Sequence, residues 1–268
     1  MALTGQTENE NTLKLEGTPN FRDLGGLVAR DGRAVRTGML FRTEGPEFLT
    51  GRDSEKLRAC GIRLVCDLRS EGERHAAPNS WCEGMDVEIL ESGGAVDLRA
   101  RNNDAWEALR ADPSARGARR AVIHNYRAMP WALAVDLRRL IDGMLVHGRL
   151  PALIHCTAGK DRTGFVVAML LLALDIPRDT VFEDYLLSAR HMTDRFHPSV
   201  RDTFRDTFGY EPSPETLAAM TGIDGEYLAA SLASVEEESG SLETYFAENM
   251  GLTGDKQSRL RDLLLDGS

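Results

Sequence analysis

The sequence contains few of the residues that mark several large classes of protein. Only four of its 268 residues are cysteine. None of the spacings between Cys60, Cys66, Cys82 and Cys156 is the Cys-x2-Cys pair of a zinc site, and the histidines share no ligand spacing. We therefore expect no disulfide framework, no metal and no cofactor, and a reducing compartment.

Long hydrophobic runs and excess positive charge are also missing. The longest apolar stretch, residues 165–174, is too short to span a bilayer, and residues 1–11 are polar with no apolar core of a signal peptide. We expect a cytoplasmic protein with no integral membrane contact, although export without a signal would leave no trace. With 42 acidic against 32 basic residues the net charge is −10, which argues against a nucleic-acid partner.

The apolar pattern alternates between strand-length and helix-length segments. Residues 62–68 form a β-branched apolar run, preceded by a short helical pattern over 54–59, and weaker strand signals lie at 27–29 and 39–42. A helix over 131–145, a strand over 150–154 and an apolar helix over 163–174 follow. This order predicts one α/β domain with a central, mostly parallel sheet flanked by helices.

Two regions depart from this alternation. Residues 96–127 alternate arginine with acidic residues around a Pro-Ser-Ala-Arg-Gly joint, so they form either a helical lid over the site or a solvated helical insertion. From 178 to 265 the pattern is helical, with candidate helices at 180–192, 213–220, 225–238, 241–250 and 255–265.

The most informative segment is His-Cys-Thr-Ala-Gly-Lys-Asp-Arg-Thr-Gly, residues 155–164, between the strand at 150–154 and the helix at 163–174. A loop after a parallel strand directs backbone N–H groups and the positive end of the next helix at one point, where an anion binds. We expect the backbone of Thr157, Ala158, Gly159, Lys160 and Asp161 to form this cradle. Arg162 adds a planar fork that holds two oxyanion oxygens at once.

Cys156 opens the loop, and a thiol so placed favours the nucleophilic thiolate. These groups permit phosphoryl transfer, in which Cys156 attacks phosphorus, the loop and Arg162 stabilise the equatorial oxygens, and a phosphocysteine is hydrolysed without a metal. Thr163 is expected to donate its hydroxyl to the sulfur, and His155 to fix the loop through backbone hydrogen bonds.

A bare Cys-x5-Arg is expected by chance in roughly 0.4 copies in a chain of this composition, but His155, Gly159 and Gly164 lower this to about one in ten thousand. The loop resembles the signature of the bacterial cysteine-based protein tyrosine phosphatase family. Three further segments share the resemblance: Asn-Phe-Arg-Asp-Leu-Gly-Gly at 20–26, Asp-Leu-Arg-Ser at 67–70 and Asp-Tyr-Leu-Leu-Ser at 184–188.

The resemblance implies a four- or five-stranded parallel sheet, a helical lid in some members, and activity on phosphotyrosine with tolerance of phosphoserine and phosphothreonine. Lys160 and Asp161 are similar to loop residues of lipid phosphatases, which makes a phosphoinositide the alternative substrate to a phosphorylated protein. An inactive phosphoprotein-binding module, and sulfur or arsenate chemistry, are the competing classes. Cys156, Arg162 and Thr163 are all present, which argues against the inactive module.

The sequence leaves two candidates for the general acid that protonates the leaving group. No Trp-Pro-Asp sequence, which supplies this group in animal tyrosine phosphatases, occurs in the chain. Asp67 ends a predicted strand at the same sheet edge as Cys156, but it could instead form an ion pair with Arg22 or Arg69. Asp161 lies within the loop itself. The two aspartates could also divide the work, one protonating the leaving group and the other positioning water.

Overall fold

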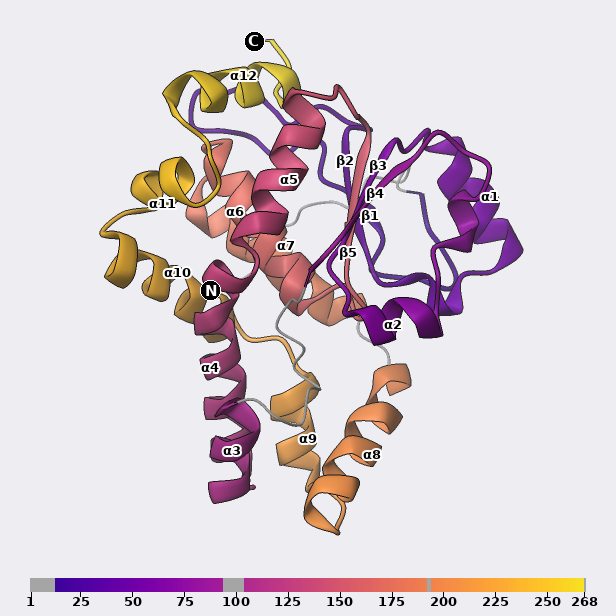
Figure 1. Cartoon of the computed structure of the whole chain (residues 1–268), viewed down its shortest axis with the longest axis vertical. Helices are drawn as coiled ribbons and strands as arrows, with labels where there is room; N and C mark the ends of the chain where they lie inside the picture. Colours follow the sequence, from indigo (N-terminus) through magenta and orange to yellow (C-terminus); the bar gives the residue numbers. More distant parts are fainter. Residues whose placement is uncertain (1–12, 94–103, 192–193, 268) are drawn as a thin grey trace.

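A computed structural model describes residues 13–93, 104–191 and 194–267 of the chain. Its centre is a five-stranded sheet in the order β1-β2-β5-β3-β4, in which only β1 runs antiparallel to its neighbour (Figure 1). This confirms the expected α/β class. The strands are β1 (Arg22–Asp23), β2 (Leu40–Thr43), β3 (Leu64–Asp67), β4 (Glu88–Glu91) and β5 (Ala152–His155).

Helices surround this sheet. They are α1 (Gly51–Ala59), α2 (Glu71–Ala76), α3 (Asp104–Ala111), α4 (Ala115–Ala132), α5 (Ala134–Leu145), α6 (Asp161–Ala173), α7 (Arg178–His191), α8 (His197–Phe208), α9 (Pro214–Thr221), α10 (Gly225–Ser239), α11 (Leu242–Glu248) and α12 (Gly254–Leu264). Within the described residues, no helix combines the length and apolar character needed to cross a membrane.

The alternation of side chains along the strands divides the core between the two faces of the sheet. Leu153 of β5 and Val65 of β3 pack on one face with α1 and Trp81. Ile154 and Cys66, one residue further on, face the larger core, which is built mainly from helices α4 to α7 and α10 to α12. The apolar helix α6 is buried in this larger core almost throughout, as its sequence predicts.

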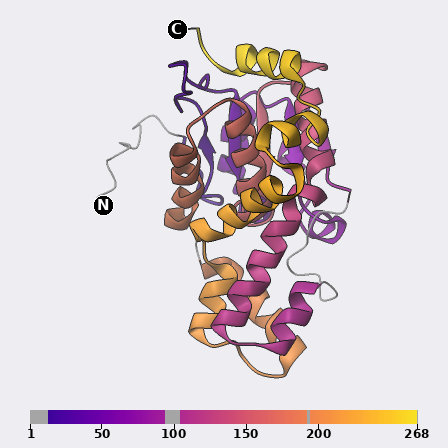
Figure 2. The ribbon, with the colours of Figure 1, turned by 90° about the vertical axis from the view of Figure 1, so that its left-hand side faces the viewer.

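A helical lobe projects beyond the carboxyl ends of the strands (Figures 1 and 2). In it α4 packs against α3 and α9, and α8 packs against α9. The lobe has its own small apolar core around Trp106, Leu109 and Phe204. Of the expected insertion over 96–127, residues 96–103 lie outside the described residues. The remainder forms α3 and most of α4, and α4 continues without a break into the main core, where Met129 is fully buried.

The register of the three middle strands fixes the place of the site. Thr43 of β2 and Asp67 of β3 both pair with His155 of β5, so these strands end at one level. The residues that follow them therefore meet at a single edge, and this edge faces the helical lobe (Figure 1).

Candidate active site

Cys156 follows the last residue of β5, and α6 begins five residues later at Asp161. The first N–H groups of a helix have no carbonyl partner within the helix, and they carry the positive end of its dipole. The loop from Cys156 to Lys160 and the first turn of α6 thus form a site for an anion, in the place that the sequence predicts.

Hydrogen bonds hold the carbonyl groups of the loop on its outer side. The Thr157 oxygen accepts from the Gly45 N–H at 2.9 Å. The Gly159 oxygen accepts from Asn20 Nδ2 and from Arg42 Nη2, both at 3.0 Å. Because the carbonyls are held outside, the N–H groups of the loop are left to the anion.

Gly159 is the residue that this close approach requires. Its φ is +65°, and a Cβ there would lie 2.6 Å from the backbone oxygen of Thr43. Both the left-handed backbone and the absence of a side chain are needed, so alanine would displace the loop from β2.

A buried ionic cluster lies behind the loop. Asp184 of α7 accepts from Arg22 Nε at 2.7 Å and from Arg42 Nη1 at 2.5 Å, while Ser188 accepts from both guanidinium groups. Burial lowers the pKa of Arg42 to about 10, so the side chain stays charged near neutral pH. Burial alone would raise the pKa of Asp184, but the two arginines lower it. The segments at 20–26 and 184–188 therefore meet in space, where they hold the loop through Arg42 and Asn20.

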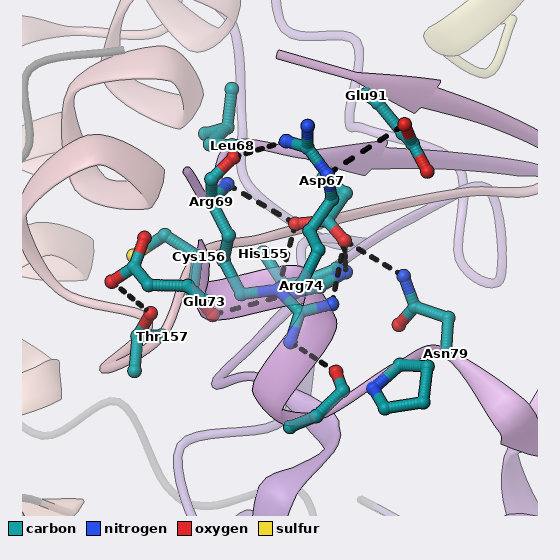
Figure 3. A network of polar contacts seen from close by, with 12 residues as sticks. Asp67, Leu68, Arg69, Glu73, Arg74, Asn79, Glu91, His155, Cys156 and Thr157 are labelled. Carbon is teal, nitrogen blue, oxygen red and sulfur yellow. Dashed lines mark hydrogen bonds and ion pairs between the residues drawn. The ribbon is translucent and has the colours of Figure 1, made fainter. Parts of the chain in front are cut away.

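Arg162 is fixed by groups from another part of the sheet edge. Its Nη1 donates to the Leu68 carbonyl at 3.0 Å and to Glu73 Oε2 at 2.8 Å, and its Nη2 donates to Glu73 Oε1 at 2.9 Å. Figure 3 shows Glu73 on α2 with its carboxylate directed at Thr157, beside Cys156, and the Thr157 hydroxyl donates to it at 2.5 Å. The guanidinium is thus held at the start of α6.

A cavity of about 100 Å³ opens above these residues. Its polar lining includes Cys156, Asp161 and Arg162 from the loop and α6, together with Asn125 from α4. Its apolar lining comes mainly from the helical lobe: Trp106, Leu109, Ala118, Ala121, Val122, Phe196, Val200 and Met220. Side chains from residues 104–127 thus contribute directly to the lining of this cavity.

Asp161 is the carboxylate that reaches this cavity. Its Oδ1 accepts from Lys160 Nζ at 2.6 Å and from the Tyr126 hydroxyl at 2.7 Å. Burial raises the pKa of Tyr126, so the phenol keeps its proton and remains a donor. Lys160 also donates to the Gly222 carbonyl at 3.3 Å, which ties the loop to the end of α9.

Asp67 lies at the edge that the sequence predicts, but its surroundings argue against proton donation. The carboxylate is fully buried and accepts from Nε and Nη2 of Arg69 at 2.8 and 2.6 Å and from Asn79 at 2.8 Å (Figure 3). Burial alone would raise the pKa of Asp67, but the charge of His155, together with the hydrogen bonds and charge of Arg69, holds it below its usual range. Asp67 therefore forms the ion pair that was the alternative to a general-acid role, with Arg69 as its partner, while Arg22 pairs with Asp184 instead.

The sequence also predicts roles for His155 and Thr163 beside the nucleophile. His155 Nδ1 lies 3.3 Å from the Cys156 carbonyl oxygen, which fits the expected backbone contact. Thr163 Oγ1 is buried beside the loop, but within the described chain it has no hydrogen-bond partner, so the expected donation to the sulfur is not formed in this structure.

Sequence comparison agrees with this geometry. A model of the tyrosine phosphatase family matches residues 13–266. The chain belongs to the tyrosine phosphatase family. It is 32% identical to the triple specificity protein phosphatase PtpB of Mycobacterium tuberculosis, over 94% of this chain and 98% of that protein. It is 29% identical to a putative tyrosine-protein phosphatase of Cupriavidus necator, over 90% of this chain and 85% of the relative.

Among solved structures, the chain matches P. aeruginosa TpbA with a TM-score of 0.35 and 17% identity, over 71% of this chain and 91% of the other. The family membership makes this chain a cysteine-based phosphatase.

Sequence reasoning missed three residues of the site: Glu73, Tyr126 and Arg42. Glu73 carries a visible local signal, since Ser70-x-x-Glu73 is a helix capping box, but that pattern predicts only a helix start. The partners of Glu73 and Tyr126 in the loop lie 89 and 35 residues away in the chain. Only the fold brings them together.

Proposed function

We propose that this tyrosine phosphatase hydrolyses phosphate monoesters through a phosphocysteine, with protein phosphotyrosine as its first substrate and phosphoserine and phosphothreonine also accepted. One observation carries the proposal: Cys156 and Arg162 line the same cavity as the apolar side chains of the helical lobe. The phosphate of a phosphotyrosine side chain can bind the loop while its aromatic ring packs against the apolar lining of the cavity.

In the first step the Cys156 thiolate attacks phosphorus, forming the S–P bond as the P–O bond to the leaving group breaks. The loop N–H groups and Arg162 stabilise the equatorial oxygens. Asp161 lines the cavity beside both residues, so it is the carboxyl group placed to protonate the departing oxygen.

In the second step water attacks the phosphocysteine. Asp161, now ionised, takes a proton from the water as the new P–O bond forms and the S–P bond breaks. Inorganic phosphate is released and the thiolate is restored. Tyr126 and Lys160 hold the Asp161 carboxylate in both steps through their contacts with Oδ1.

A phosphoinositide is the second candidate substrate. Lys160 and Arg162 both line the cavity, so two positive side chains face an anionic headgroup. The relative PtpB is named a triple specificity phosphatase, which supports a broad substrate range for this family member.

The test is hydrolysis, with chelator present, of a phosphotyrosine peptide, a phosphoserine peptide and a short-chain phosphatidylinositol phosphate, each with Cys156→Ser alongside. We expect turnover that disappears in Cys156→Ser, with the phosphotyrosine peptide hydrolysed fastest. Fastest hydrolysis of the lipid would replace the protein substrate with the phosphoinositide. No turnover on any substrate, with phosphopeptide binding retained, would favour the binding module instead.

A further inference from the structure

The carboxylate of Glu73, in the short helix α2, accepts four hydrogen bonds. Oε2 accepts from the Ser70 N–H at 2.8 Å and from Arg162 Nη1 at 2.8 Å, and Oε1 accepts from Arg162 Nη2 at 2.9 Å and from the Thr157 hydroxyl at 2.5 Å. The Arg162 and Glu73 side chains are only 7% and 10% exposed. Such a contact exceeds what a helix cap requires.

The pattern of bonds leaves one side of the Arg162 fork for substrate. A guanidinium has five N–H groups. Leu68 and Glu73 take three of them, through Nη1 and one hydrogen of Nη2. The Nε hydrogen and the second Nη2 hydrogen have no acceptor among the described residues, and these two form a parallel pair suited to two oxygens of a phosphate.

We propose that Glu73 is a positioning residue, which fixes the plane of Arg162 and the Thr157 side chain so that the loop is ready for a phosphoryl group. This inference rests on the proposed function and deepens it. An arginine held in place loses less conformational freedom when substrate binds, and its donors are aligned before the reaction. Glu73 acts through Arg162 and does not itself reach substrate.

The opposite role for Glu73 is an anion mimic, which would occupy the oxyanion position and inhibit the enzyme. Two observations argue against it. Cys156, Thr157 and Arg162 line the cavity, whereas Glu73 does not. The capping box with Ser70 also holds the carboxylate at α2, outside the loop.

The two roles predict effects of opposite sign, so Glu73→Gln is the informative variant. Glutamine keeps the capping box, since this motif accepts either residue, but its amide NH2 is opposed to a donor of Arg162. The matched control is Glu71→Gln, because Glu71 is exposed, lies in the same turn of α2 and removes the same charge.

The first readout is the dissociation constant of inorganic phosphate, measured by calorimetry on the full chain, and the second is kcat/KM on the best substrate. We expect Glu73→Gln to weaken phosphate binding and lower kcat/KM by about 10- to 100-fold, the usual effect of losing a supporting contact. Glu71→Gln should stay within about twofold of the unaltered protein. In an Arg162→Lys background, Glu73→Gln should add less than about twofold, because the two residues act as one unit.

Tighter phosphate binding by Glu73→Gln would overturn the proposal in favour of the anion mimic. Values equal to those of Glu71→Gln, with the same thermal midpoint, would overturn it in favour of a helix cap alone. Phosphate binding does not require turnover, so it tests Glu73 even if the unaltered chain hydrolyses no substrate, an outcome that would count against the proposed function alone.

Discussion

Replacing Glu44 with glutamine should stabilise the protein far more at pH 8 than at pH 5. Glu44 follows β2 directly beside the loop, and its side chain is buried. Within the described chain neither carboxylate oxygen has a hydrogen bond of normal geometry. Burial raises the pKa of Glu44 from 4.5 to about 7, while the charge of Arg195 and the Asn20 backbone offset only part of that effect. Ionised Glu44 therefore destabilises the folded state.

The raised pKa of Glu44 fixes both the sign and the size of the effect. Between pH 4.5 and 7 the folded chain holds a proton that the unfolded chain has lost, so the free energy of unfolding falls as pH rises through this window. The loss is complete only well above pH 7, and a shift from 4.5 to about 7 corresponds to about 3 kcal/mol. Most of it, about 2 to 3 kcal/mol, develops between pH 5 and pH 8.

The measurement is urea unfolding of the unaltered protein and Glu44→Gln at both pH values, because glutamine does not titrate. The advantage of Glu44→Gln should grow by about 2 to 3 kcal/mol from pH 5 to pH 8. Glu47→Gln, an exposed change three residues along, should show no such growth. An advantage that is equal at the two pH values, within about 0.5 kcal/mol, would refute the claim that Glu44 is buried without adequate partners.

Two further substitutions separate the roles of the loop and the lobe. Gly159→Ala should lower kcat/KM at least about tenfold and also lower the melting temperature, because the added Cβ would collide with the Thr43 backbone. The control is Gly148→Ala, where φ is +61° and no atom lies close to the added Cβ. This control should cost only about 1 kcal/mol of backbone strain and leave activity unchanged. Phe204→Ala should destabilise the lobe by about 3 to 5 kcal/mol and raise KM more than it lowers kcat. Amide hydrogen exchange in this variant should become faster in α3 and α4 than in β5. Exchange that is equally fast in the lobe helices and in β5 would contradict an independent lobe core.

The sequence correctly predicted the strands and helices whose position depends mainly on local apolar spacing and on residues that end a helix or strand. The strands expected at 62–68 and 150–154 are β3 and β5, and the helix expected at 163–174 is α6. All five helices expected after residue 178 are present, within a few residues at each end. These segments have apolar residues at strand or helix spacing and are bounded by glycine, proline or a capping residue, so sequence alone specifies them.

Other helices and strands were not predicted, because their stability comes from contacts with residues far away in the sequence. Helix α8, over His197–Phe208, was not expected, since it buries little besides Phe204 and depends on the lobe core for its place. The strand expected near residues 27–29 is a single bridge between Val28 and Ala34. β4 pairs only with β3, at the edge of the sheet, and its residues alternate too briefly to predict a strand.

Asp67, Glu73 and Asp161 all lie close to the loop that holds Cys156, and the hydrogen-bond donors around each carboxylate distinguish their roles. Asp67 is held by Arg69 and Asn79, and Glu73 is held by Arg162, Thr157 and Ser70, so each is committed to ordering other groups. Asp161 is the one of the three that lines the cavity, and its two side-chain donors, Lys160 and Tyr126, both bind Oδ1. In the proposed reaction, Oδ2 is therefore the oxygen that exchanges a proton with the leaving group in the first step and with water in the second.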